Sequence, residues 1–191
     1  MLHAAAAASR SSLGTRLREN WGAYMLLALV VYGVKRFYSD ASVEELRFVL
    51  GPTASLLEAA TGAAWPFEAG VGFVSVAHNT AVVSGCAGVN FLIAAVATLV
   101  LGGVHRCACW RGKAAWFVGA CALSYLATIV ANTTRILADV AVRSAGIMHA
   151  VGGSHDEVHR LLGVLVYFGA LSWLYHVVEA GPWRREPPCS T

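Results

Sequence analysis

The stretch 80–104, TAVVSGCAGVNFLIAAVATLVLGGV, decides the fold of this chain. It contains no charged residue, and it is long enough to cross the hydrocarbon core of a bilayer, which takes roughly 20 apolar residues of helix. Residues 114–134 and 161–178 meet or approach the same standard. Across 191 residues the chain is 57% hydrophobic and only 13% charged. This composition is typical of an integral membrane protein rather than a soluble domain.

A fourth span is expected at 21–38. This segment is apolar as far as Val34 and then ends in Lys35 and Arg36, whose long side chains can carry their charges to the membrane interface. We therefore predict an all-α integral membrane protein with about four transmembrane helices, interfacial helices and a small β-hairpin on the outer face.

The expected organisation is a single membrane-embedded domain at 21–178, between a cytoplasmic lead-in at 1–20 and a cytoplasmic tail at 179–191. The alanine-rich residues 1–12 are expected to be disordered, and no cleavage site for a signal peptide follows the first apolar stretch.

The loop 105–113 sets the orientation, because it carries three lysine or arginine residues and no acidic residue. Positively charged loops stay in the cytoplasm, so we expect this loop inside. Four spans then place both termini inside and bring Cys86, Arg135 and His159 to the outer face. The net charge is only +3, and basic residues gather at the ends of apolar runs, which argues against a nucleic-acid partner.

The segment between the first two spans is expected to stay outside the bilayer core. Helical spacing of apolar residues predicts two short interfacial helices at 42–50 and 53–61, separated by a break at Gly51-Pro52. Residues 72–77 and 80–83 surround a turn and predict a hairpin that leads into Cys86. Unpaired strand edges cannot face lipid, which shortens the second span to about 87–104.

Cys86 is the first candidate for chemistry. It precedes a predicted membrane helix, where unpaired backbone N–H groups and the helix dipole favour a thiolate over a thiol. It is also the only cysteine that the predicted topology places outside, so no disulfide partner is expected within the chain. The alternative is a structural cysteine that packs as a small apolar residue.

Arg135 follows the outer end of the third predicted span. One interpretation is an ion-paired stripe, in which Arg135, Asp139 and Arg143 follow one another at four-residue spacing. The other is oxyanion stabilisation, because a guanidinium keeps its charge and offers fixed hydrogen-bond donors. The sequence leaves both interpretations open.

His159 opens the last predicted span. It is either an interfacial histidine or a general acid–base that carries a proton between a thiol and a leaving amine. His155 lies one helical turn earlier, so a metal site is a further alternative, with ligands added by Cys86, His78 or His149. No compact zinc motif supports that alternative.

Three short motifs, each beside a predicted membrane helix, together resemble the exosortase/archaeosortase family: SGCAGVNF at 84–91, NTTRI at 132–136 and HRLLG at 159–163. The resemblance covers roughly 42–178. Larger members of the family have more spans, so it implies a short, core-only exosortase form of the exosortase K type.

The resemblance implies a cysteine transpeptidase of the bacterial inner membrane, with its active site on the outer (periplasmic) face. Cys86 would attack a peptide carbonyl and form a thioester, Arg135 would stabilise the oxyanion, and His159 would protonate the departing amine. Asn132 and Asn90 are candidate supporting residues.

The implied partners are membrane-anchored proteins with a C-terminal, PEP-CTERM-like sorting signal, an acceptor nucleophile that the sequence does not identify, and the lipid bilayer. No nucleic acid, cofactor or metal is expected. Three alternatives remain: an interfacial cysteine protease that uses water, a non-catalytic four-span membrane protein, and a metal-binding membrane protein built on His155 and His159.

Overall fold

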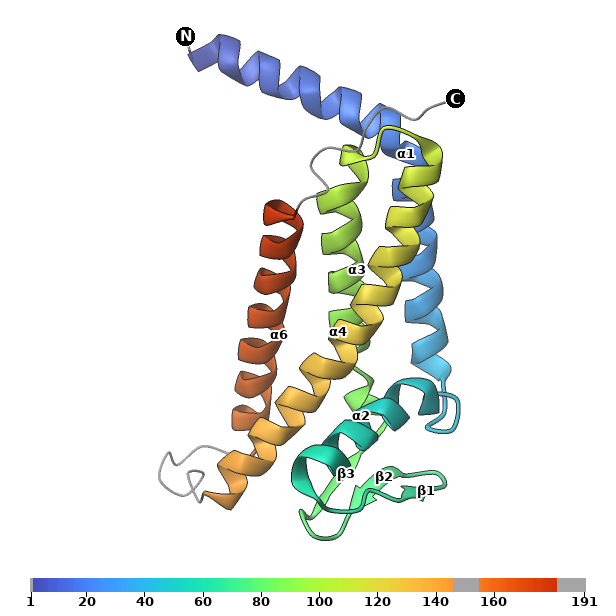
Figure 1. Cartoon of the computed structure of the whole chain (residues 1–191), viewed down its shortest axis with the longest axis vertical. Coiled ribbons are helices and arrows are strands. Elements are labelled where there is room, and N and C mark those ends of the chain that lie inside the picture. Colours follow the sequence, from blue (N-terminus) through green and yellow to red (C-terminus); the bar gives the residue numbers. More distant parts are fainter. Residues whose placement is uncertain (1, 146–154, 182–191) are drawn as a thin grey trace.

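The computed structural model describes residues 2–145 and 155–181, which are mostly helical (Figure 1). Four long helices run side by side for much of their length: α1 (Leu2–Asp40), α3 (Val89–Gly103), α4 (Trp110–Ser144) and α6 (His155–Ala180). Among the described residues, three segments are long and apolar enough to cross a membrane: Ser84–Arg106, Trp110–Ser144 and Glu157–Ala180. They coincide with three of the four predicted spans.

Helix α1 differs from its prediction at both ends. Residues 2–12 are helical, so the expectation of a disordered lead-in is wrong; alanine is the strongest helix former. The first part of α1 leaves the bundle, and its second part lies beside α3, where Leu27 is buried (Figure 1). α1 is not among the segments that are apolar enough to span, because charged residues flank its apolar stretch on both sides.

Helix α2 (Arg47–Thr61) is continuous, so the predicted break at Gly51-Pro52 is wrong. Pro52 lies inside the helix and has no N–H for the carbonyl of Phe48, one turn earlier. The hydroxyl of Tyr125 on α4 donates a hydrogen bond to that carbonyl instead. The helix therefore continues through its proline because a neighbouring helix satisfies the group that the proline leaves unbonded.

Where the sequence predicts a hairpin, the structure has a three-stranded antiparallel sheet in the order β1 (Phe67–Glu68), β2 (Gly72–Ser75), β3 (Thr80–Val82). Strand β1 was not anticipated. Gly72 has a φ of 131°, and a β-carbon there would lie 2.2 Å from the carbonyl oxygen of Val82, so the sheet requires glycine at this position.

The sheet and α2 lie together at one end of the long helices, and the N-terminus lies toward the other end (Figure 1). A short 3-10 turn, η1 (Ser84–Ala87), joins β3 to α3. Apolar residues of α2, β3, η1 and α4 form one buried cluster, which holds η1 against the helices: Leu50, Leu57, Val82, Ala87 and Ile136.

Candidate active site

Cys86 lies on η1, between the sheet and α3. Its backbone N–H donates to the carbonyl of Val83 over 2.8 Å, and its own carbonyl accepts a hydrogen bond from the side-chain amide of Asn132 on α4. The side chain is half-buried, and the cysteine is free. Cys86 therefore precedes the first turn of α3, whose unpaired N–H groups were expected to favour a thiolate.

Gly88 separates η1 from α3 with a φ of 66°. A β-carbon at this position would lie 3.1 Å from the Thr128 methyl carbon on α4 and 3.7 Å from the Tyr167 hydroxyl on α6. The turn that carries Cys86 therefore packs closely against two of the membrane-spanning candidates.

Asn132 connects this turn to α6. It is fully buried, donates to the Cys86 carbonyl, and accepts a hydrogen bond of 3.1 Å from the Tyr167 hydroxyl. Asn90, the second predicted supporting residue, lies elsewhere. Its side chain is exposed and accepts a 3.2 Å hydrogen bond from Lys35 on α1, so it ties α1 to α3.

Arg135 packs against α6. Its guanidinium carbon lies 5.6 Å from the centre of the Tyr167 ring, and a β-carbon at Gly163 would lie 3.5 Å from its Cδ. The hydroxyl of Tyr167 also donates to Asn132, whose amide donates to the Cys86 carbonyl. Tyr167 therefore lies beside Arg135 and is linked through Asn132 to the backbone of Cys86.

The ion-paired stripe is present only in part. Asp139 forms an ion pair of 3.1 Å with Arg143, but no ion pair joins it to Arg135 within the described parts of the chain. The Nε of Arg135 is buried and has no hydrogen-bond partner among those residues. A buried N–H without a partner is costly, and the Nε of Arg143 on the same helix is in the same state.

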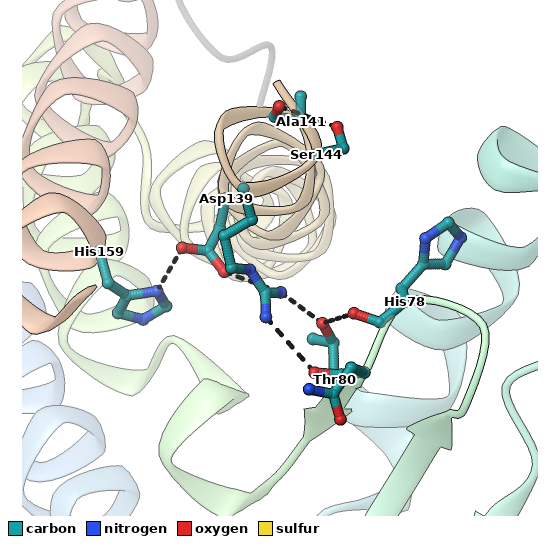
Figure 2. A network of polar contacts seen from close by, with 8 residues as sticks. His78, Thr80, Asp139, Ala141, Ser144 and His159 are labelled. Atoms are coloured by element: carbon teal, nitrogen blue, oxygen red, sulfur yellow. Dashed lines mark hydrogen bonds and ion pairs between the residues drawn. The ribbon is translucent and has the colours of Figure 1, made fainter. Parts of the chain in front are cut away.

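His159 lies on α6, one helical turn before Gly163. Its Nδ1 is 3.4 Å from Oδ1 of Asp139, which is one turn beyond Arg135 on α4 (Figure 2). Arg135 and His159 thus occupy neighbouring turns of the same α4–α6 interface. The described contacts place His159 against Asp139.

Two residues of this cluster were missed or misjudged from the sequence. Tyr167 was not singled out, although its spacing of eight residues from His159 puts both on one face of a helix, together with Gly163. Asp139 was considered only as a member of a surface ion-pair stripe, whereas its side chain is buried between two helices.

The sequence also left open a metal site. Among the described residues, no three or more histidine, cysteine, aspartate or glutamate side chains form a group that could hold a metal ion. Two of the candidate metal ligands are not covered by this statement, because His149 and the side chain of His155 lie outside what the structure describes.

The fold is helical, and the length and apolar composition of three of its segments indicate a membrane protein. Compared with protein-family models, with curated proteins and with solved structures, the chain shows no match in any of the three. The assignment of a particular function therefore rests on the residues of this chain and their geometry.

Proposed function

We propose that this protein is a membrane cysteine transpeptidase of the exosortase/archaeosortase type. The observation that carries the proposal is the chain of contacts that links the Cys86 carbonyl through Asn132 and Tyr167 to Arg135, with His159 on the next turn of the α4–α6 interface. Cys86, Arg135 and His159 are the three residues that carry the resemblance to the family, and they come from three separate segments of the chain.

In the proposed reaction the sulfur of Cys86 attacks the carbonyl carbon of a peptide bond next to the sorting motif. The carbonyl oxygen becomes an oxyanion, which Arg135 stabilises with its positive charge. The carbon–nitrogen bond then breaks, His159 gives a proton to the departing amine, and a thioester remains on Cys86. An acceptor nucleophile then attacks the thioester, the carbon–sulfur bond breaks, and the acceptor's proton passes through His159 to the Cys86 sulfur, which restores the thiol.

We propose a topology of four spans in a bacterial inner membrane, with the second part of α1 as the first span and the loop 105–113 in the cytoplasm. Lys35 and Arg36 would then lie at the outer interface, where charges are costly unless they are solvated or paired. The structure supports this placement, because Lys35 donates to Asn90 and Arg36 pairs with Asp40. The site would open to the periplasmic face.

The proposed substrates are exported proteins whose C-terminal signal contains a Pro-Glu-Pro-type motif, a membrane helix and a basic cluster. Enzyme and substrate would then share the plane of the membrane, which lowers the entropic cost of bringing the scissile bond to the thiol. Small residues on α4 and α6 would allow a substrate helix to pack closely beside them.

The proposal is tested by co-expression with tagged proteins that end in such signals, including those encoded near this protein's own gene. Wild type is expected to remove the C-terminal helix, while Cys86→Ala leaves the substrate intact. Cys121→Ala is the matched control, because Cys121 is also a half-buried free cysteine but lies away from the proposed site.

The mass of the processed protein distinguishes transfer from hydrolysis, because transfer adds the acceptor and hydrolysis adds only water. Addition of water alone would favour the interfacial cysteine protease. Equal processing by wild type and Cys86→Ala, or no processing of any signal, would contradict the proposal and favour a non-catalytic membrane protein.

A further inference from the structure

Asp139 is a buried carboxylate between two basic groups (Figure 2). Its side chain on α4 is 7% exposed, with Oδ1 facing His159 Nδ1 at 3.4 Å and Oδ2 facing Arg143 Nη2 at 3.1 Å. Each carboxylate oxygen therefore has its own partner, one on α6 and one on α4. A carboxylate at this depth is costly unless it is paired in this way.

Arg143 is itself held by the sheet. Its guanidinium donates to the carbonyl of Asn79, over 3.4 Å, and to the hydroxyl of Thr80. That hydroxyl in turn donates to the carbonyl of His78 over 2.9 Å (Figure 2). Arg143 thus connects Asp139 to the turn between β2 and β3, which limits the movement of the carboxylate in front of His159.

We propose that Asp139 is a positioning residue for His159, and that Arg143 holds Asp139 in place through its other carboxylate oxygen. A neutral imidazole carries its proton on one nitrogen, and a carboxylate beside Nδ1 favours the form with the proton there. Nε2 then holds the lone pair and points away from Asp139. The same division of roles orients the histidine in known nucleophile–histidine–carboxylate triads.

This inference rests on the proposed function, in which it accounts for each proton. Nε2 of His159 takes the proton of the Cys86 thiol as the sulfur–carbon bond forms, and gives it to the amine nitrogen as the carbon–nitrogen bond breaks. Asp139 keeps no proton at any step. Its negative charge balances the imidazolium that exists between the two transfers.

A purely structural role is the alternative to be tested. In that case Asp139 would serve only to pair Arg143 and join α4 to the sheet, and His159 would be indifferent to it. Stability alone cannot separate the two roles, because removing either partner of a buried ion pair is destabilising in both. The protonated nitrogen of His159 does separate them.

The experiment records nitrogen-15 spectra of the full-length protein, labelled at its histidines and held in micelles, at a pH where the imidazoles are neutral. Seven histidines contribute, and His159→Gln identifies the signals of His159. Wild type is expected to show His159 protonated at Nδ1. In Asp139→Asn, His159 is expected to lose its preference for the proton at Nδ1, because the new amide can donate to that nitrogen. In the control variant Asp40→Asn, His159 should stay protonated at Nδ1.

With purified protein and tagged substrate in detergent, Asp139→Asn is expected to lower the rate of processing by roughly 10²–10⁴-fold with little change in substrate KM. A wild-type His159 protonated at Nε2 would overturn the inference whether or not Asp139→Asn folds. Identical nitrogen-15 signals of His159 in wild type and in Asp139→Asn would overturn the inference as well.

Failure of the inference and failure of the proposed function remain distinguishable. A wild-type protein that processes its substrate but has His159 protonated at Nε2 would retain the function and reject the role of Asp139. A wild-type protein with the expected tautomer but no cysteine-dependent processing would reject the proposed function, and the catalytic role of Asp139 with it.

Discussion

Gly88 joins the turn of Cys86 to helix α3, and its backbone conformation leaves little choice of residue. A φ of 66° is strained for any residue with a β-carbon, and the methyl group of Thr128 would lie only 3.1 Å from that carbon. The glycine therefore lets η1 approach α4 and α6 closely enough for Asn132 to reach the Cys86 carbonyl.

We expect Gly88→Ala to destabilise the protein by about 1–2 kcal/mol and to displace Cys86, because it combines backbone strain with crowding. Thermal unfolding in detergent and the rate of Cys86 alkylation measure the two effects. Gly85→Ala is the matched control on the same turn, since Gly85 has an ordinary φ and nothing within 4 Å of its β-carbon position. Equal behaviour of the two variants would contradict this explanation.

At the residue scale, Cys86, Arg135 and His159 could be nominated from the sequence because their residue types and their positions beside apolar runs are visible there. The residues that contact them in the structure could not be predicted in this way. The contacts of Tyr167 and Asp139 depend on how α4 and α6 are aligned, which pairs Asp139 with His159 and Asn132 with Tyr167. Periodicity within one helix does not fix the alignment between two helices.

At the scale of elements, α2 shows why local sequence rules gave a wrong boundary. Gly51-Pro52 is a strong break signal, yet the Tyr125 hydroxyl replaces the donor that Pro52 lacks. The hydrogen bond joins residues 77 positions apart in the chain, so no local window of sequence contains it.

Tyr125→Phe is expected to lower the free energy of unfolding by about 1 kcal/mol, since the Phe48 carbonyl loses its donor. Pro52→Ala supplies a backbone N–H at the same place, so the loss caused by Tyr125→Phe should become smaller in the Pro52→Ala background. A double-mutant cycle on the free energy of unfolding measures this coupling. Additive effects would show that Tyr125 does not compensate for the proline.

The loop before α2 is tied to the turn between β1 and β2 by a pH-sensitive contact. The backbone N–H of Gly70 donates to Glu44 over 2.8 Å, and this hydrogen bond holds the pKa of the Glu44 carboxyl below its usual value. A lowered pKa in the folded state means that the contact is complete above the ordinary glutamate range and is lost as the pH falls through the lowered value.

The amide signal of Gly70, followed by NMR during acidification, is therefore expected to move with a midpoint below that of an ordinary glutamate. Glu44→Gln should abolish the movement, and Glu58→Gln, at another exposed glutamate, should leave it unchanged. A midpoint at or above the ordinary value would contradict the contact.

At the scale of the whole molecule, the apolar composition predicted three helices that could cross a membrane, and the structure has them. Length and hydropathy are sufficient for this result, because a bilayer requires a minimum apolar length of each crossing helix. The fourth span and the orientation depend on the ends of α1 and on loop charge, and both remain predictions.

Labelling of single cysteines with a membrane-impermeant maleimide tests the orientation in intact spheroplasts. The background lacks the native cysteines, and the labelled positions are exposed: Val76 next to the sheet is 88% exposed, and Trp110 at the start of α4 is 74% exposed. Val76→Cys should react in intact cells, and Trp110→Cys only after permeabilisation. The reverse pattern would place the proposed site in the cytoplasm.

The central claim is that Cys86 forms a thioester with the substrate, and trapping this intermediate tests it most directly. Wild-type protein is mixed with a tagged substrate, quenched in acid and analysed by intact mass and peptide mapping. We predict a covalent adduct on the peptide that contains Cys86, which hydroxylamine releases and which Cys86→Ala lacks while Cys121→Ala retains it. Substrate cleavage without such an adduct, or an adduct on another residue, would contradict the mechanism.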